Sequence, residues 1–217
     1  MGRPPSTTRP VGLFCGLAVV DVIQLVQAPP GPDDKIVALD QLIAAGGPAT
    51  NAAVAFAALG GRATLAAPVG AGPLAELVRA DLAGTGVELL DCSDRSGGSD
   101  GAGLAPGLSV SSCTITAGTG RRSVISTNAR AAVDTAPLDR YVARAACGQE
   151  TPPDVVLIDG HNPALARAAL DLAARVGALT VMDAGSWKDP AADLPARCDV
   201  VAASARFYPP GPAGPVT

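Results

Sequence analysis

The residues from Gly46 to Gly61 constrain the fold of this chain more than any other stretch. Two adjacent glycines let the backbone turn sharply and come close to a ligand. Pro48 then suits the first position of a helix, where its missing N–H costs nothing. An alanine-rich segment follows and stops at Gly60-Gly61, which is typical of a helix that packs close to a sheet. The stretch therefore predicts a strand end, a glycine turn and a helix over 48–59.

Asn51 is the residue that favours a ligand site at this turn. It falls in the first helical turn, beside the two glycines. A polar amide at the start of an apolar helix needs a partner once it is buried. The competing interpretation is an ordinary buried helix that happens to follow a glycine turn, and the stretch alone leaves both open.

Composition removes several classes of protein. The 217 residues carry a net charge of −4 without a basic run, which argues against a nucleic-acid surface. No apolar run reaches the roughly 18–20 residues of a membrane span. The five scattered cysteines lack a C-x-x-C pair, which predicts reduced thiols, no zinc site and a cytoplasmic protein. A P-loop and a G-x-S-x-G elbow are both absent, and His161 is the single histidine.

Apolar segments alternate with helical patterns along the chain, which predicts an α/β fold with a parallel sheet. Glycine and proline mark most of the boundaries. A Gly118-Thr119-Gly120 turn between two alternating segments adds a hairpin over 108–127. We expect core strands at 11–21, 62–70, 86–90, 153–160, 179–183 and 198–203, and further helices at 72–84, 138–147 and 164–176.

Polar residues follow several of these strands. Ligands bind open α/β sheets at the carboxyl ends of the strands. We therefore expect one edge to carry Asp21, Gly46-Gly47, Asp159-Gly160-His161 and the loop from Asp183 to Lys188. Lys188 fits a phosphate partner and equally a solvated lysine, and His161 fits a packed side chain as well as a functional one. The catalytic residues stay unidentified.

The glycine stretch also resembles the first signature of the ribokinase-like (PfkB) carbohydrate kinases, namely Gly-Gly, three residues, Asn and an Ala-rich helix closed by Leu-Gly. Asp21 after the first apolar run and the Asp-Gly-His turn fit the N-terminal two-thirds of that family. The resemblance implies a mainly parallel sheet with flanking helices and a small β-lid, with lid segments near 35–45 and 108–127. It implies ATP-dependent phosphorylation of a sugar hydroxyl with Mg²⁺.

By the same resemblance, Asp21, Gly46, Gly47 and Asn51 would bind a sugar or nucleoside, and Asp183 and Lys188 would lie at a phosphate or nucleotide edge. A homodimer through the lid is a further expectation. No metal-binding residues are assigned.

The chain departs from the family's pattern in two respects. The second signature, Asp-Thr-x-Gly-Ala-Gly-Asp, is absent, and Gly70-Ala71-Gly72 replaces an acidic turn. We expect an arm at 1–10, an incomplete domain at 11–206 and a Pro/Gly tail at 207–217. The chain as given is then an inactive or weak sugar kinase, or alternatively a non-catalytic sugar-binding or interaction module. A fragment, a truncated gene product and a degenerate copy fit equally.

Overall fold

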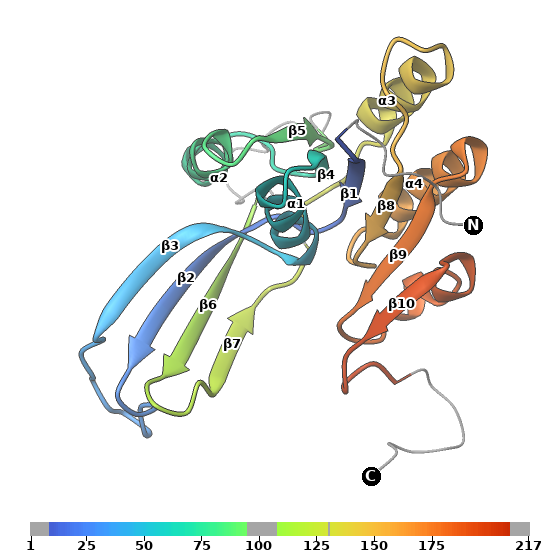
Figure 1. The fold of residues 1–217 in the computed structure, drawn as a ribbon. Helices are drawn as coiled ribbons and strands as arrows, with labels where there is room; N and C mark the ends of the chain where they lie inside the picture. The colour runs from blue at the N-terminus through green and yellow to red at the C-terminus, as the bar shows by residue number, and fades with distance from the viewer. Residues whose placement is uncertain (1–8, 95–107, 130, 209–217) are drawn as a thin grey trace.

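The computed structural model describes residues 9–94, 108–129 and 131–208, which form two β-sheets and four α-helices (Figure 1). The expected arm and the Pro/Gly tail lie largely outside these residues. The larger sheet consists of β1 (Val11–Cys15), β4 (Arg62–Ala67), β5 (Val87–Asp91), β8 (Val155–Ile158), β9 (Leu179–Ala184) and β10 (Val200–Ala203). The smaller sheet consists of β2 (Val19–Val26), β3 (Asp40–Gly46), β6 (Ser109–Thr116) and β7 (Arg122–Ser126).

The larger sheet has the order β10-β9-β8-β1-β4-β5, and all its pairings are parallel. Its helices are α1 (Pro48–Ala58), α2 (Pro73–Ala83), α3 (Ala136–Ala146) and α4 (Pro163–Val176), with short 3₁₀ turns at Asp189–Ala191 and Pro195–Arg197. The helices α1 and α2 pack on one face, and α3 and α4 on the other. The predicted α/β class and parallel sheet are therefore confirmed.

Two apolar clusters fill the space between the sheet and its helices. Leu13, Val156 and Ile158 pack against the buried face of α4. On the other side, Ala49 and Ala53 of α1 are fully buried near Leu65. Small side chains at these α1 positions let the helix approach the sheet closely, as the alanine-rich sequence predicts.

The smaller sheet has the order β3-β2-β6-β7 and projects from the larger one (Figure 1). The strand β2 pairs antiparallel with β3 and parallel with β6. The pair β6 and β7 is the antiparallel hairpin expected over 108–127. In the lid segment expected near 35–45, the strand β3 begins only at Asp40.

One expectation was wrong: the apolar run 11–21 is not a single core strand. β1 ends at Cys15, the chain turns through Gly16-Leu17-Ala18, and β2 continues in the smaller sheet. All ten residues from 11 to 20 are buried, so hydrophobicity does not mark the break. Asp21 consequently lies within β2, two residues after its start, and not at the carboxyl end of a core strand.

The face of β8, β9 and β10 on the α1 side is only partly covered. Paired positions on this face are Val155, Leu157, Leu179, Val181 and Val200. Leu179 and Val200 are about half exposed, at 49% and 47%. On the opposite face, β8 and β9 are covered, since Val156, Ile158 and Met182 are buried. Parallel sheets normally have both faces covered, so this region is unusual.

Candidate functional site

The carboxyl edge of the larger sheet brings together three distant segments around one carboxylate. Asp159 follows β8 and is 2% exposed. Its Oδ2 accepts hydrogen bonds from the backbone N–H of Leu17 at 2.7 Å and of Ala49 at 3.2 Å. Its Oδ1 accepts one from the N–H of His161 at 2.9 Å. The turn after β1, the first turn of α1 and the turn after β8 are thereby joined.

Two further buried side chains hold the same turn. The Thr50 hydroxyl donates to the carbonyl oxygen of Leu17 at 3.2 Å, and Thr50 is fully buried. The Asn162 amide donates to the carbonyl oxygen of Gly16 at 2.9 Å. The sequence signals for these residues were weak, because a Thr inside a helix and an Asn before a proline are both common without a tertiary role.

Gly47 has the unusual backbone that the glycine turn requires. Its φ of 103° and ψ of 150° lie in a region that only glycine adopts readily. A Cβ at this position would overlap the carbonyl oxygen of Leu17. The two glycines therefore allow the start of α1 to pack directly on the turn after β1.

The carboxylate of Asp21 on β2 lies over Gly46 of β3, which is its diagonal neighbour because Asp21 pairs with Ala44. A Cβ at Gly46 would overlap the carboxylate of Asp21, so only glycine leaves room for that group. Asp21 is half-buried, and within the described part of the chain its side chain has no hydrogen-bond or ion-pair partner. A partly desolvated carboxylate of this kind is suited to accept hydrogen bonds from a polar ligand.

Asn51 differs from the expectation of a buried amide. It is exposed, and its backbone N–H continues the helix by donating to Gly47 at 2.9 Å. Because the N-terminal turn of α1 is packed by Ala49, Thr50 and Ala53, Asn51 falls on the outer side. A buried-amide argument therefore does not apply to this residue, and its role in ligand binding stays a prediction.

The structure places Asp183 and Lys188 within electrostatic reach of His161. Burial lowers the pKa of His161, and the positive charge of Lys188 lowers it further, while the Asp159 and Asp183 carboxylates oppose both. Burial also lowers the pKa of Lys188, against the same two carboxylates. The amino group of Lys188 donates to the carbonyl and hydroxyl oxygens of Ser186, both at 3.2 Å.

The loop that carries Lys188 is anchored by aromatic side chains. Trp187 and Phe207 pack with ring centroids 5.4 Å apart, and the indole N–H of Trp187 donates to Asp189 at 2.8 Å. This packing fixes the backbone next to Lys188 at the carboxyl edge. The edge therefore presents a cation beside the histidine turn.

The described residues do not offer a metal centre. They contain no group of three or more His, Cys, Asp or Glu side chains arranged to hold an ion. Asp159 is surrounded by N–H donors, so its oxygens are already used. All five cysteines are free, and burial raises the pKa of Cys92 to about 12, which keeps this thiol protonated.

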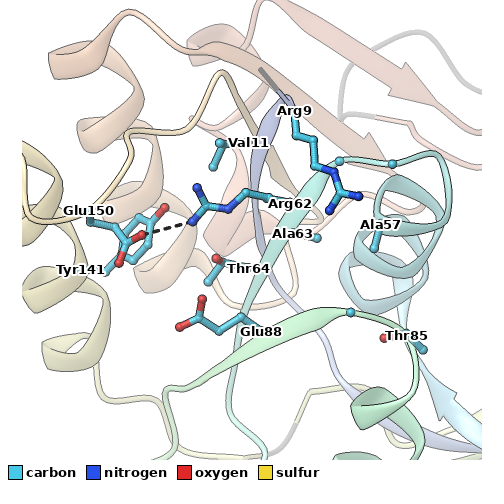
Figure 2. Close-up of a pocket in the computed structure, with 13 residues that line it drawn as sticks. Arg9, Val11, Ala57, Arg62, Ala63, Thr64, Thr85, Glu88, Tyr141 and Glu150 are labelled. Atoms are coloured by element: carbon cyan, nitrogen blue, oxygen red, sulfur yellow. Dashed lines mark ion pairs between the residues drawn. The ribbon is translucent and has the colours of Figure 1, made fainter. Parts of the chain in front are cut away.

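A cavity of about 220 Å³ lies at the opposite, amino edge of the sheet (Figure 2). Its wall includes Arg9, Arg62, Glu88, Tyr141 and Glu150. Arg62 pairs with Glu150 at 3.7 Å, and burial raises the pKa of Tyr141 to about 12. Since β1, β4 and the start of β5 separate this cavity from Asp159 and Asp21, it is not part of the carboxyl-edge site.

None of the helices in the described ranges is long and apolar enough to cross a membrane. No protein-family model matches the chain, and neither does any curated protein sequence. Similarity is found among solved structures.

A microbiome-derived acarbose kinase superposes with a TM-score of 0.69 at 21% identity, covering 89% of this chain and 60% of its own. A protein from Agrobacterium tumefaciens named provisionally as a ribokinase gives 0.66 at 22% identity, with coverages of 89% and 59%. The ribokinase of Arabidopsis thaliana, solved with ribose and ATP, gives 0.58 at 15% identity, with 90% and 60%. The chain thus spans about 60% of the length of these structures.

Proposed function

We propose, from the premise that this chain has the ribokinase-like fold of the PfkB carbohydrate kinases, that the site formed by Asp21 and the Gly46-Gly47 turn binds a sugar or nucleoside through hydroxyl groups. The observation that carries the proposal is the half-buried Asp21 carboxylate, which faces Gly46 without a protein partner in the described residues. Two oxygens of one carboxylate match the spacing of neighbouring sugar hydroxyls.

The surroundings of Asp21 support the same assignment. Gly46 leaves space at the carboxylate, and Gly47 directs the chain away into α1. Asn51 lies one helical turn further on its exposed side, where its amide is available to a ligand. The smaller sheet would act as the lid over this site, consistent with its projection from the larger sheet (Figure 1).

Calorimetric titration of the chain with a panel of sugars and nucleosides tests this assignment. For a ligand that the parent chain binds, Asp21→Asn should weaken affinity by about 10-fold to 100-fold, because each hydrogen bond to a charged group contributes about 1.5–3 kcal/mol. Asp40→Asn is the matched control, since Asp40 lies on the same face at the far end of β3. Equal affinity in the parent and Asp21→Asn would refute the role.

Phosphoryl transfer is the second part of the proposal. Lys188 at the β9 edge would meet a phosphate, with Asp183 beside it, and ATP with Mg²⁺ would be the donor by analogy with the family. The described residues do not themselves form a metal cluster, so no catalytic step is assigned to Mg²⁺. Activity in this chain would be weak or absent, because no residue in it matches the family's second signature.

The alternative is a non-catalytic sugar-binding or interaction module with the same fold. The two proposals agree on Asp21 and differ on nucleotide binding, which titration with Mg·ATP distinguishes. The five free cysteines fit a reducing compartment, and we place the protein in the cytoplasm under both.

The smaller sheet would also supply a homodimer contact. Ile43, Val22, Ser112 and Ile125 lie in one row across its four strands, on the face opposite Asp21. Ile43 is 46% exposed and Ile125 is 78% exposed. Three of these four side chains are apolar, and an apolar row of this kind on an exposed sheet favours pairing with a second copy.

A further inference from the structure

Asp159 joins both ends of the β2–β3 hairpin to the larger sheet. Leu17 lies two residues before β2, and Ala49 lies three residues after β3. A single oxygen, Oδ2, accepts the backbone N–H of both residues, at 2.7 Å and 3.2 Å. The entry and the exit of the hairpin are thus fixed by the same atom.

The packing around this carboxylate leaves it little freedom. A Cβ at Gly16 would overlap the Asp159 carboxylate, and a Cβ at Gly47 would overlap the Leu17 carbonyl. The hydroxyl of Thr50 and the amide of Asn162 hold the carbonyls of Leu17 and Gly16. The turn is thus held by side chains from the start of α1, from the residue after β8 and from the residue before α4.

The second carboxylate oxygen of Asp159 contacts the turn after β8, next to the loop that carries Lys188. Oδ1 accepts the N–H of His161 at 2.9 Å, and His161 lies within electrostatic reach of Asp183 and Lys188. Asp159 therefore lies between the hairpin that carries Asp21 and the loop that carries Lys188, and it contacts neither of those side chains through a hydrogen bond.

We infer that Asp159 is a positioning residue: its carboxylate fixes the base of the β2–β3 hairpin and thereby the placement of Asp21 and Gly46 toward a bound ligand. The binding part of this inference rests on the proposed function. A carboxylate is needed because all of its contacts are N–H donors. The amide of an Asp159→Asn variant would turn its own N–H₂ group toward at least one of them.

The test compares Asp159→Asn with Asp154→Asn. Asp154 precedes β8 and accepts the N–H of Val11 at 2.9 Å. It therefore links the amino ends of β1 and β8, whereas Asp159 lies at their carboxyl ends. Amide hydrogen exchange is measured residue by residue, together with sugar affinity by calorimetry. For Asp159→Asn we expect faster exchange at Leu17 and Ala49, unchanged exchange at Val156, and affinity about 10-fold to 100-fold weaker. For Asp154→Asn we expect parental affinity.

Each outcome decides one part of the inference. Parental exchange at Leu17 and Ala49 in Asp159→Asn overturns the positioning role. Faster exchange with parental affinity overturns its link to the ligand. If the parent chain binds no sugar or nucleoside, the proposed function fails, and exchange alone still decides whether Asp159 fixes the hairpin.

A second variant covers the case in which Asp159→Asn does not fold. Gly16→Ala keeps the carboxylate but displaces it, because a Cβ at Gly16 overlaps Asp159 and Gly16 does not have a positive φ. A folded Gly16→Ala chain with faster exchange at Ala49 and weakened sugar binding supports the inference. The same variant with parental exchange at Leu17 and Ala49 and parental affinity overturns it.

Discussion

Single residues at the carboxyl edge differ in how far the sequence could predict them. Gly47 could be predicted, because the backbone freedom of glycine is a local property that adjacent residues reveal. Asn51 was expected to be buried and is exposed, since burial depends on which side of α1 faces the sheet. The importance of Asp159 could not be predicted, because its partners are 142 and 110 residues away in sequence.

Gly47 offers a test of backbone strain with a matched control. Gly60 also has a positive φ, 94°, but a Cβ there meets nothing within 4 Å. Gly60→Ala should cost only the conformational strain, about 1–3 kcal/mol. Gly47→Ala should cost about 1–3 kcal/mol more, because its Cβ overlaps Leu17, and Gly47→Val should cost more again. Urea denaturation measures both, and equal costs would contradict the overlap argument.

The single histidine provides a direct test of the site's electrostatics. Burial and Lys188 lower the pKa of His161, so NMR titration should give a midpoint below 6.5. Lys188→Met should raise that midpoint, and Asp183→Asn should lower it. Arg175→Met is a control that removes a positive charge from the last turn of α4, and it should leave the midpoint unchanged.

The depressed pKa of His161 also has a stability consequence. The imidazole of His161 binds a proton more tightly in the unfolded chain than in the folded chain. The stability contributed by neutral His161 is therefore present above pH 6.5. It is lost as the pH falls below 6.5 toward the folded pKa. His161→Gln should reduce this loss in denaturation measurements, and an unchanged pH dependence would exclude His161 as its source.

At the scale of elements, helices were predicted better than the division between sheets. Proline at the start of α1, α2 and α4, and glycine at or just after their ends, mark the limits locally. The break between β1 and β2 has no such marker, because both strands are apolar and Gly16 sits inside the run. Sheet membership depends on pairing partners far away in sequence, namely β4 and β8 for one strand and β3 and β6 for the other.

The apolar row of the smaller sheet predicts a measurable association. Ile125→Lys should shift sedimentation of the chain toward the monomer, because it places a charge at the most exposed apolar side chain of the proposed contact. Val124 is next to Ile125 in sequence but lies on the opposite face of the sheet. Val124→Lys is therefore the control and should sediment like the parent chain. A monomeric parent at micromolar concentration would contradict the homodimer.

At the scale of the whole molecule, the chain has the fold of solved ribokinase-like structures and covers about 60% of their length. The resemblance read from the glycine stretch is confirmed at the level of the fold. Which face of β8 and β9 is only partly covered could not be predicted, because both faces are apolar in the sequence. Val155, Leu157 and Val181 are incompletely buried, whereas Val156, Ile158 and Met182 are packed under α4.

Phosphoryl transfer would depend on the whole chain, because its groups come from several strands and loops. The purified chain with ATP, Mg²⁺ and a sugar panel should turn over well below about 1 s⁻¹, the low end for kinases. Loss of a positioned base alone costs about 10²–10⁴ in rate. Asp159 is not a replacement, because its oxygens accept three backbone N–H groups. Faster turnover that disappears in Asp183→Asn would instead identify Asp183 as the base.

The hydrogen bond from Ala49 to Asp159 has an electrostatic consequence for ligand choice. The amino end of a helix carries a partial positive charge and commonly attracts phosphate. In α1 that charge already faces a buried carboxylate, and Pro48 contributes no N–H. The start of α1 is therefore an anion site filled by the protein itself. Under the proposed function, this position would suit uncharged hydroxyl groups, and a negatively charged part of a ligand would instead meet Lys188 in the loop after β9.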